Sequence, residues 1–279
     1  MVCKKRSLRF LLLAACLATF SNGVLADAKG SVVEEQGWKS AFDKFNTNGT
    51  IIVKDERGNQ SKTFIYNKER SIERFTPAST FKIPHTLFAL DSGVVRDEFQ
   101  VFKWDGEKHE IPSHNADQNL RSAMRHSALW VYRGFAKEIG KEKATSYLQG
   151  ISYGNQDASV KKRDYWVDGG LKVSAQEQID FLEKLYRNEL SFKVEHQLLT
   201  KDIMVIEAGR EWIIRAKTGL GSQVGWWVGW IEWPTGPVFF ALNIDTPNRM
   251  ADAPKREEIG RMLLNAVGAL PSAQAVVTQ

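Results

Sequence analysis

The sequence Pro77-Ala78-Ser79-Thr80-Phe81-Lys82 opens an apolar, helix-like run that continues as Ile83-Pro84-His85-Thr86-Leu87-Phe88-Ala89-Leu90. Residues three positions apart share one face of a helix, so this run predicts that Ser79 and Lys82 lie side by side. A serine hydroxyl is a weak nucleophile until a base removes its proton. An unprotonated lysine, or a group made from it, could be that base, and the stretch therefore permits an activated serine.

A serine three positions before a lysine is weak evidence alone, because the chain contains a second match at Ser159-Val160-Lys161-Lys162. That match lies in a charged stretch without apolar periodicity, and we interpret it as a solvated loop. Ser79 instead follows Thr76, which offers local capping chemistry, and precedes a buried-looking helix. On these residues alone, Ser79 as an ordinary first-turn residue and Lys82 as a surface charge remains the alternative.

The first 26 residues have the pattern of a secretory signal peptide. Four basic residues precede an apolar core from Phe10 to Phe20, and Val24-Leu25-Ala26 supplies small residues before Asp27. We expect cleavage after Ala26 and a periplasmic mature protein. The alternatives are an uncleaved anchor, for which the apolar core is short, and a lipoprotein modified at Cys16, which ends Leu13-Ala14-Ala15-Cys16.

The composition is that of a globular protein with one large domain or two lobes: 279 residues, 43% apolar and 25% charged. Cleavage would remove four of the 38 basic residues and leave 34 against 33 acidic ones, a balance that does not support nucleic-acid binding. Cys3 and Cys16 would also leave, so no disulfide is expected. The five histidines have no ligand spacing, and no metal site is predicted.

Strand patterns occur at both ends of the chain. A short helix over 38–45 and a hairpin of strands over 49–54 and 63–66 come first. The last seventy residues give strands over 212–217, 225–231 and 238–244 and then a closing helix over 256–267. Sequential strands with short links favour an antiparallel meander.

The middle of the chain is mostly helical. Helices are expected over 122–139, from 143 to 148, and over 174–190, where Ser174-Ala175-Gln176-Glu177 forms a capping box. The loop over 153–173 is long and has little helical or strand pattern. Long loops inside compact domains more often have a function than serve only as connections. We therefore predict an α+β protein with one antiparallel sheet built from both termini, flanked by helices. Its single catalytic domain (27–279) has a sheet lobe of about 27–75 and 211–279 and an inserted helical lobe of about 76–210.

Three further fragments set Ser79 and Lys82 apart from a chance match: Ser127-Ala128-Leu129, Tyr153-Gly154-Asn155 and Lys217-Thr218-Gly219. Their order and spacing resemble those of the serine penicillin-recognising enzymes. The Tyr-Gly-Asn element, followed by Asp164-Tyr165-Trp166 and by Gly225-Trp226-Trp227-Val228-Gly229, is similar to the class D β-lactamases, the oxacillinases. The resemblance covers essentially the whole mature chain. It implies a β-lactamase/transpeptidase-like fold and hydrolysis of the β-lactam amide of penicillins and related antibiotics, which confers resistance.

The resemblance also implies catalytic roles. Ser79 would form the acyl-enzyme, and Lys82 would be carboxylated by CO2 to N6-carboxylysine and act as the general base, with no other cofactor. Trp166 would donate its indole N–H to this carbamate. Ser127 would pass a proton to the leaving nitrogen, and Lys217 would keep the surroundings of Ser127 positive.

Further residues would shape the pocket. Thr218 and Arg249 would bind the substrate carboxylate, and the backbone N–H groups of Ser79 and Leu220 would form the oxyanion hole. Leu129 and Val167 would stand over Lys82, where the family usually has valine and a leucine or isoleucine. Tyr153 and Asn155 would be structural.

Two alternatives belong to other functional classes: a β-lactam sensor or penicillin-binding domain that acylates without turnover, and a D,D-peptidase. Sensors have transmembrane helices, and the mature chain has no apolar run long enough for one. The expected partner is a small-molecule β-lactam, with no nucleic acid and no integral membrane span, and the protein is expected to be a monomer or homodimer.

Overall fold

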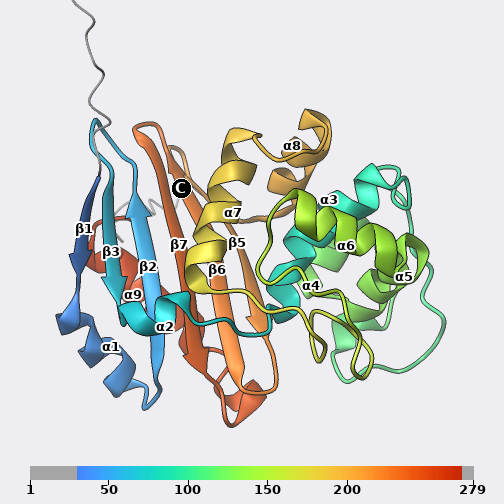
Figure 1. The fold of residues 1–279 in the computed structure, drawn as a ribbon, viewed down its shortest axis with the longest axis horizontal. Coiled ribbons are helices and arrows are strands. Elements are labelled where there is room, and N and C mark those ends of the chain that lie inside the picture. The colour runs from blue at the N-terminus through green and yellow to red at the C-terminus, as the bar shows by residue number, and fades with distance from the viewer. Residues whose placement is uncertain (1–29, 272–279) are drawn as a thin grey trace, which may run out of the picture.

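One mixed sheet organises the computed structural model, which describes residues 30–271 (Figure 1). Its strand order is β1-β3-β2-β7-β6-β5-β4. The bounds are β1 Ser31–Glu34, β2 Gly49–Asp55, β3 Lys62–Tyr66, β4 Val205–Ala208, β5 Ile213–Leu220, β6 Val224–Trp233 and β7 Gly236–Asp245. The predicted hairpin and meander are confirmed as antiparallel, and β2 pairs with β7, so the two ends of the chain share the sheet. Only the edge pair β1–β3 departs, being parallel within the described residues.

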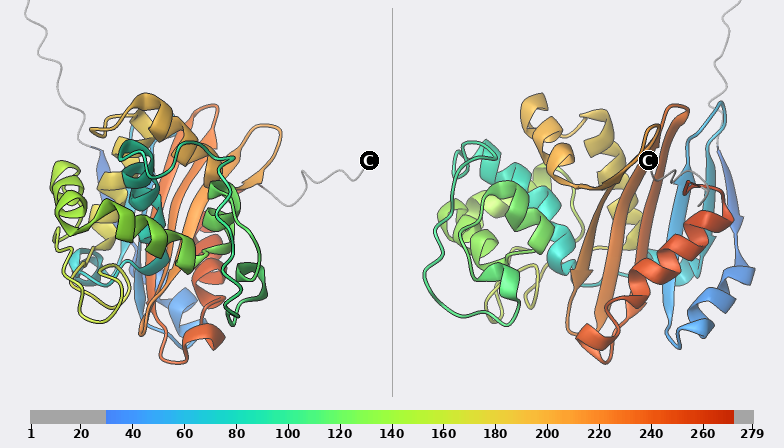
Figure 2. Two further views of the ribbon diagram at one scale, coloured as in Figure 1. Left: turned by 90° about the vertical axis from the view of Figure 1, so that its right-hand side faces the viewer. Right: turned by 180° about the vertical axis from the view of Figure 1, so that it is seen from behind.

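Helices cover both faces of this sheet. The bounds are α1 Lys39–Lys44, α2 Lys68–Ile72, α3 Lys82–Asp91, α4 Leu120–His126, α5 Leu129–Ile139, α6 Lys141–Gly150, α7 Ala175–Arg187, α8 Val194–Ile203 and α9 Lys255–Ala266. Helix α7 lies on one face, beside the lobe formed by α3 to α6 and α8, and α9 crosses the opposite face (Figure 2). The predicted α+β class is confirmed.

The central strands are buried on both sides, which explains their unbroken apolar patterns. Successive strand side chains point to opposite faces. In β6, Trp226, Val228 and Trp230 pack toward α7 and the helical lobe, whereas Trp227 and Ile231 pack toward α1 and α9. The sheet therefore separates two cores and presents the end of β5 to the helical lobe.

Three expectations need correction. The helix predicted over 122–139 is broken at Ser127, whose φ of 57° ends α4 before α5 begins. No side-chain hydrogen bond caps the turn at Ser79 or α3; Thr76 Oγ1 donates to the carbonyl groups of Trp166 and Val167 instead. Strand β4 falls inside the range assigned to the helical lobe and forms a sheet edge.

Two other expectations are confirmed, and one concerns residues that the structure does not describe. The capping box at Ser174 is present at the start of α7, and the loop over 153–173 contains no helix or strand. The predicted signal peptide, including Cys16 and the cleavage position, lies outside the described residues.

Candidate active site

Ser79 and Lys82 lie where the chain tightens from a 3-10 helix, η2 (Ala78–Phe81), into α3. Lys82 Nζ donates a hydrogen bond to Ser79 Oγ at 2.9 Å. Lys82 is fully buried, whereas Ser79 is partly exposed. The predicted side-by-side placement is therefore observed, with the hydroxyl open to a ligand and the amine beneath it.

Burial controls the charge of Lys82. The loss of solvation holds the pKa of this amine well below the ordinary 10.5, and the neighbouring positive charge of Lys217 lowers it further. Asp164 opposes this shift, but its carboxylate is itself paired with Arg133. A neutral amine beside a serine hydroxyl can accept a proton, which a protonated lysine cannot do.

Ser127 lies at the break between α4 and α5, and Lys217 Nζ donates a hydrogen bond to its Oγ. The left-handed backbone at Ser127 turns this side chain toward β5, which carries Lys217. Burial lowers the pKa of Lys217 to about 7, and the positive charge of Arg256 contributes to the shift. Two serine–lysine pairs thus meet between the sheet and the helical lobe.

The loop over 153–173 is hydrogen-bonded through Trp166 to the nucleophile turn, by which we mean Thr76 to Phe81 with Ser79 in it. The Trp166 carbonyl accepts hydrogen bonds from the backbone N–H of Ala78 at 2.9 Å and from Thr76 Oγ1 at 3.0 Å. Phe75 and Val173 exchange two further backbone hydrogen bonds. These hydrogen bonds therefore join Trp166 directly to Ala78, the residue before Ser79.

Trp166 belongs to a buried aromatic cluster around Lys82. Its ring packs on Phe81 at 5.9 Å and on His85 at 5.0 Å between centroids. Lys82 Nζ lies 5.1 Å from the ring centroid of Tyr132. The indole N–H of Trp166 is buried and has no hydrogen-bond partner among the described residues. A donor left over beside Lys82 fits an acceptor attached to that lysine.

Sequence reasoning missed His85. It is fully buried, and burial lowers its pKa to about 3, so the imidazole is neutral. Its position three residues after Lys82 on the same helix was the available signal. His85 extends the apolar, uncharged surroundings that keep Lys82 unprotonated.

Strand β5 approaches the nucleophile turn closely at Gly219. A Cβ there would lie 2.9 Å from the Pro77 carbonyl oxygen and 3.1 Å from Thr80 Cγ2. Glycine therefore allows Thr218 and Leu220, the predicted substrate-binding residues, to stand on a strand directly against η2.

Arg256 is a second residue that the sequence did not indicate for the site. Its Nη1 donates to the Gly219 carbonyl at 2.8 Å, and its Nε is buried without a partner among the described residues. Arg249 is exposed in the 3-10 helix η4 (Arg249–Ala251), and no hydrogen bond or ion pair joins its side chain to the rest of the described chain. The structure places Arg256 beside the Lys217 strand, while the assignment of Arg249 stays a prediction.

The other predicted residues surround this centre. Leu129 and Val167 are partly buried and pack against the core cluster that contains Phe81 and Trp166. Tyr153 is buried, and its hydroxyl donates to Gln178. Asn155 fixes the loop through hydrogen bonds with Gly170 and Lys172.

Comparisons with known proteins identify the family. The chain matches the penicillin binding protein transpeptidase domain family over residues 24–265. It is 62% identical over 247 residues to β-lactamase OXA-20 of Pseudomonas aeruginosa, an alignment that spans 88% of this chain and 93% of that protein. It is 57% identical over 263 residues to β-lactamase OXA-2 of Salmonella typhimurium, spanning 94% and 96% of the two chains. The chain belongs to the class D β-lactamases. The class D β-lactamase YbXI from Nostoc has a matching structure, with a TM-score of 0.79, 35% identity and coverage of 84% of this chain and 99% of that one.

Two further observations concern this class D β-lactamase. Within residues 30–271, no group of three or more His, Cys, Asp or Glu side chains is arranged to hold a metal ion. No helix in that same range is long and apolar enough to cross a membrane.

Proposed function

We propose that this class D β-lactamase hydrolyses the amide bond of penicillins and related antibiotics through an acyl-enzyme on Ser79, and so confers resistance. The observation that carries the proposal is the 2.9 Å hydrogen bond between the Ser79 hydroxyl and the buried Lys82 amine, whose depressed pKa leaves it able to accept a proton. Ser79 Oγ would bond to the lactam carbonyl carbon while its proton moves to the base at Lys82.

The second serine–lysine pair suits the departure of the lactam nitrogen. When the C–N bond breaks, the nitrogen takes the proton of Ser127, and Ser127 regains one from the lysines around it. Lys217 Nζ, already bonded to Ser127 Oγ, is placed for this transfer. The backbone N–H groups of Ser79 and Leu220 are proposed to stabilise the negative oxygen that forms on the carbonyl.

Lys82 is proposed to carry a carboxyl group in the working enzyme. A neutral amine adds CO2 to give N6-carboxylysine and releases one proton. The site fits this anion in two respects: the Trp166 indole N–H lacks an acceptor among the described residues, and the Asp164 carboxylate near Lys82 is already paired with Arg133. When present, the carbamate supplies an oxygen base beside Ser79.

The substrate carboxylate would bind where β5 ends. Thr218 stands on that strand, and Arg256 lies behind it with an unused buried Nε; Arg249 was the sequence-based candidate. The two arginines are separated by comparing Arg249→Ala with Arg256→Ala. The arginine that binds the substrate carboxylate is the one whose replacement by alanine raises the KM.

Mass spectrometry tests the covalent step. After mixing with a slowly hydrolysed penicillin, the adduct should lie on the peptide that contains Ser79, and Ser79→Ala should lose both adduct and hydrolysis. An adduct on Ser159, in the second serine–lysine match, would contradict the assignment. Steady turnover of a chromogenic cephalosporin is expected; a single burst without turnover would instead indicate a sensor or a peptidase.

Bicarbonate tests the modification of Lys82. Because protonated carbamates lose CO2, activity should fall at acid pH and recover when bicarbonate is added. Trp166→Phe should weaken this recovery, since phenylalanine keeps the aromatic packing but has no N–H to donate. An enzyme that ignores bicarbonate and keeps normal turnover in Trp166→Phe would refute the carbamate.

Export to the periplasm with cleavage after Ala26 is part of the proposal. It rests on the sequence pattern of residues 1–26. N-terminal sequencing of the periplasmic fraction should begin at Asp27. A lipid on Cys16 in the membrane fraction would decide for the lipoprotein alternative.

A further inference from the structure

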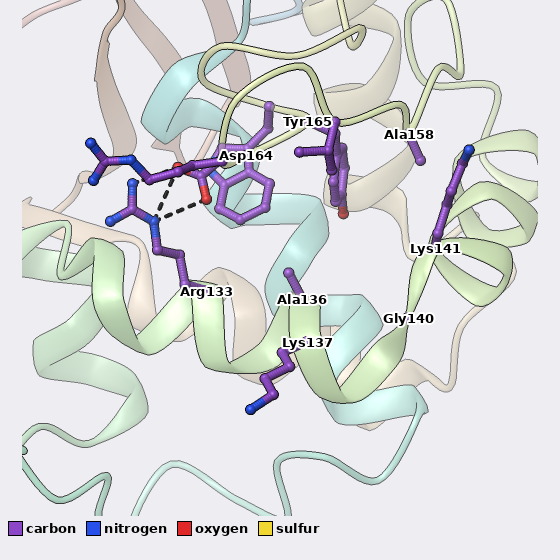
Figure 3. A pocket seen from close by; sticks show the side chains of 11 residues that line it. Arg133, Ala136, Lys137, Gly140, Lys141, Ala158, Asp164 and Tyr165 are labelled. Atoms are coloured by element: carbon purple, nitrogen blue, oxygen red, sulfur yellow. Dashed lines mark hydrogen bonds and ion pairs between the residues drawn. The ribbon is translucent and has the colours of Figure 1, made fainter.

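A cavity of about 320 Å³ lies between α5 and the loop that carries Trp166 (Figure 3). Neither Ser79 nor Lys82 lines it, but Trp166, the proposed donor to the carbamate, forms part of its wall. Cavities that hold small molecules measure roughly 300–1,000 Å³, and this one falls at the small end of that range.

The walls of the cavity are mostly apolar. Figure 3 shows Ala136 on α5 facing Ala158 and Tyr165 on the loop above it. Val160 also lines the cavity, and 55% of this side chain is exposed. A flat apolar body would cover Val160 and pack on the Tyr165 ring, and such burial stabilises by about 25 cal/mol per Å² of apolar surface.

The rim of the cavity is positively charged. Lys141 rises at one end beside Ala158 (Figure 3), and Arg163 contributes a second cation from the loop. Within the described part of the chain, no ion pair joins either residue to an acidic group. The ammonium group of Lys137 points away from the loop, so only its stem lines the space (Figure 3).

The acidic groups nearby are already engaged. Arg133 binds the buried Asp164 carboxylate through Nε and Nη2, at 3.0 and 2.7 Å. The carboxylate of Asp168 accepts backbone N–H groups of Arg163 and Asp164, and that of Asp157 accepts the N–H of Ser159. The cavity therefore combines apolar walls with cations that form no ion pair among the described residues, and Lys141 is attracted by Asp157 only at longer range.

We propose that this cavity binds a small organic anion with a flat apolar body, such as an aryl carboxylate or aryl sulfonate. The body lies between Ala136 and Tyr165, and the anionic group meets Lys141 beside Ala158, while Arg163 adds positive charge to the rim. The ligand then packs on the outer side of the Tyr165–Trp166 pair, whose ring centroids are 4.9 Å apart. Binding does not require acylation of Ser79, which does not line the cavity.

A fluorescent aryl sulfonate, 8-anilinonaphthalene-1-sulfonate, tests the proposal. Fluorescence titration uses Ser79→Ala protein with and without saturating penicillin, because the basic active site could also take the probe. Binding should persist with penicillin present. It should weaken about tenfold or more in Lys141→Glu/Arg163→Glu, while Lys143→Glu/Lys184→Glu, the same charge change at two exposed positions outside the cavity, should bind normally. Displacement by penicillin, or binding insensitive to the double variant, would overturn the proposal.

Two further measurements locate the probe. Ala136→Phe keeps every charge but fills the cavity, so it should also abolish binding; unchanged affinity would place the probe on the outer surface and refute a cavity site. Hydrogen exchange should show probe-dependent protection in the peptides covering 136–141 and 158–166. Protection elsewhere, with none there, would equally reject the assignment.

Discussion

At the scale of single residues, the site depends on two buried lysines, Lys82 and Lys217, whose pKa values burial holds below that of an exposed lysine. Lys217 shows the consequence for stability. The pKa of the Lys217 amine is 10.5 in the unfolded chain, where it is exposed, and about 7 in the folded protein. Between pH 7 and pH 10.5 the unfolded chain therefore holds a proton that the folded chain has released. Stability must then rise with pH across this window, by at most about 1.4 kcal/mol per pH unit.

Chemical denaturation of the wild type and of Lys217→Met, in buffer freed of CO2, measures this effect. Met fills a similar volume without a charge, so its stability should change less with pH. The difference in unfolding free energy between wild type and variant should move in favour of the wild type from pH 7 to pH 10. A difference that stays flat would show that Lys217 keeps an ordinary pKa.

Leu129 and Val167 give a second prediction at the residue scale. Both pack on the cluster around Trp166, and the family usually has valine at the first position and leucine or isoleucine at the second. If the larger side chain has moved from one wall to the other, total volume is kept, which cores tolerate best. Leu129→Val should cost on the order of 1 kcal/mol and alter deacylation, and Val167→Leu should crowd the pocket.

A double-mutant cycle tests this compensation. Leu129→Val/Val167→Leu should recover much of both losses in stability and in deacylation rate, because residues in contact are not independent. Distant sites add within roughly 0.3–0.5 kcal/mol. Additive effects would therefore mean that the two residues changed independently and form no common wall.

At the scale of elements, the contact between β5 and the nucleophile turn sets the geometry of the site. Gly219→Ala would place a methyl group 2.9 Å from the Pro77 carbonyl oxygen, and the strand would have to move away from Ser79. Misplacement by a fraction of an ångström to 1 Å can cost on the order of 10- to 100-fold, and we expect a loss of this size in the acylation rate. Pre-steady-state kinetics with a chromogenic cephalosporin measure it.

Gly134→Ala is the matched control for this substitution. Gly134 lies inside α5, and a Cβ there would meet no atom within 4 Å. Activity should be unchanged, and stability should be equal or higher by up to about 1 kcal/mol, because alanine favours helix. Equal losses in the two variants would mean that the close approach of β5 to η2 does not matter.

The elements also show what the sequence could and could not indicate. Ser79 and Lys82 were placed correctly because their contact is local to one turn of chain. The break at Ser127 was not foreseen, because the apolar pattern runs through it and only its left-handed backbone separates α4 from α5. The short edge strands β1 and β4 have exposed, irregular patterns. Arg256 reaches the site only through the packing of α9, which no spacing rule describes, whereas the spacing of His85 from Lys82 on α3 was a signal that the sequence offered.

At the scale of the whole molecule, the two lobes share one core. Ile52 of β2 and Leu87 of α3 are fully buried in the same cluster, which also contains Trp226 and Phe239 from the sheet. The sheet itself joins both ends of the chain through β2 and β7. Neither lobe can lose its packing without exposing the other, so the two should unfold together.

Denaturation followed by two signals tests this coupling. Far-UV circular dichroism reports mainly the helices, and tryptophan fluorescence reports strongly on β6, which carries Trp226, Trp227 and Trp230. The two transitions should coincide. Ile52→Ala and Leu87→Ala, each expected to cost about 2–5 kcal/mol, should shift both signals by the same amount although they lie in different lobes. Val194→Ala, at an exposed position on α8, should shift neither. If Leu87→Ala separated the helical signal from the tryptophan signal, the lobes would be independent folding units, and the position of Lys82 against β5 would then depend on docking and not on a common core.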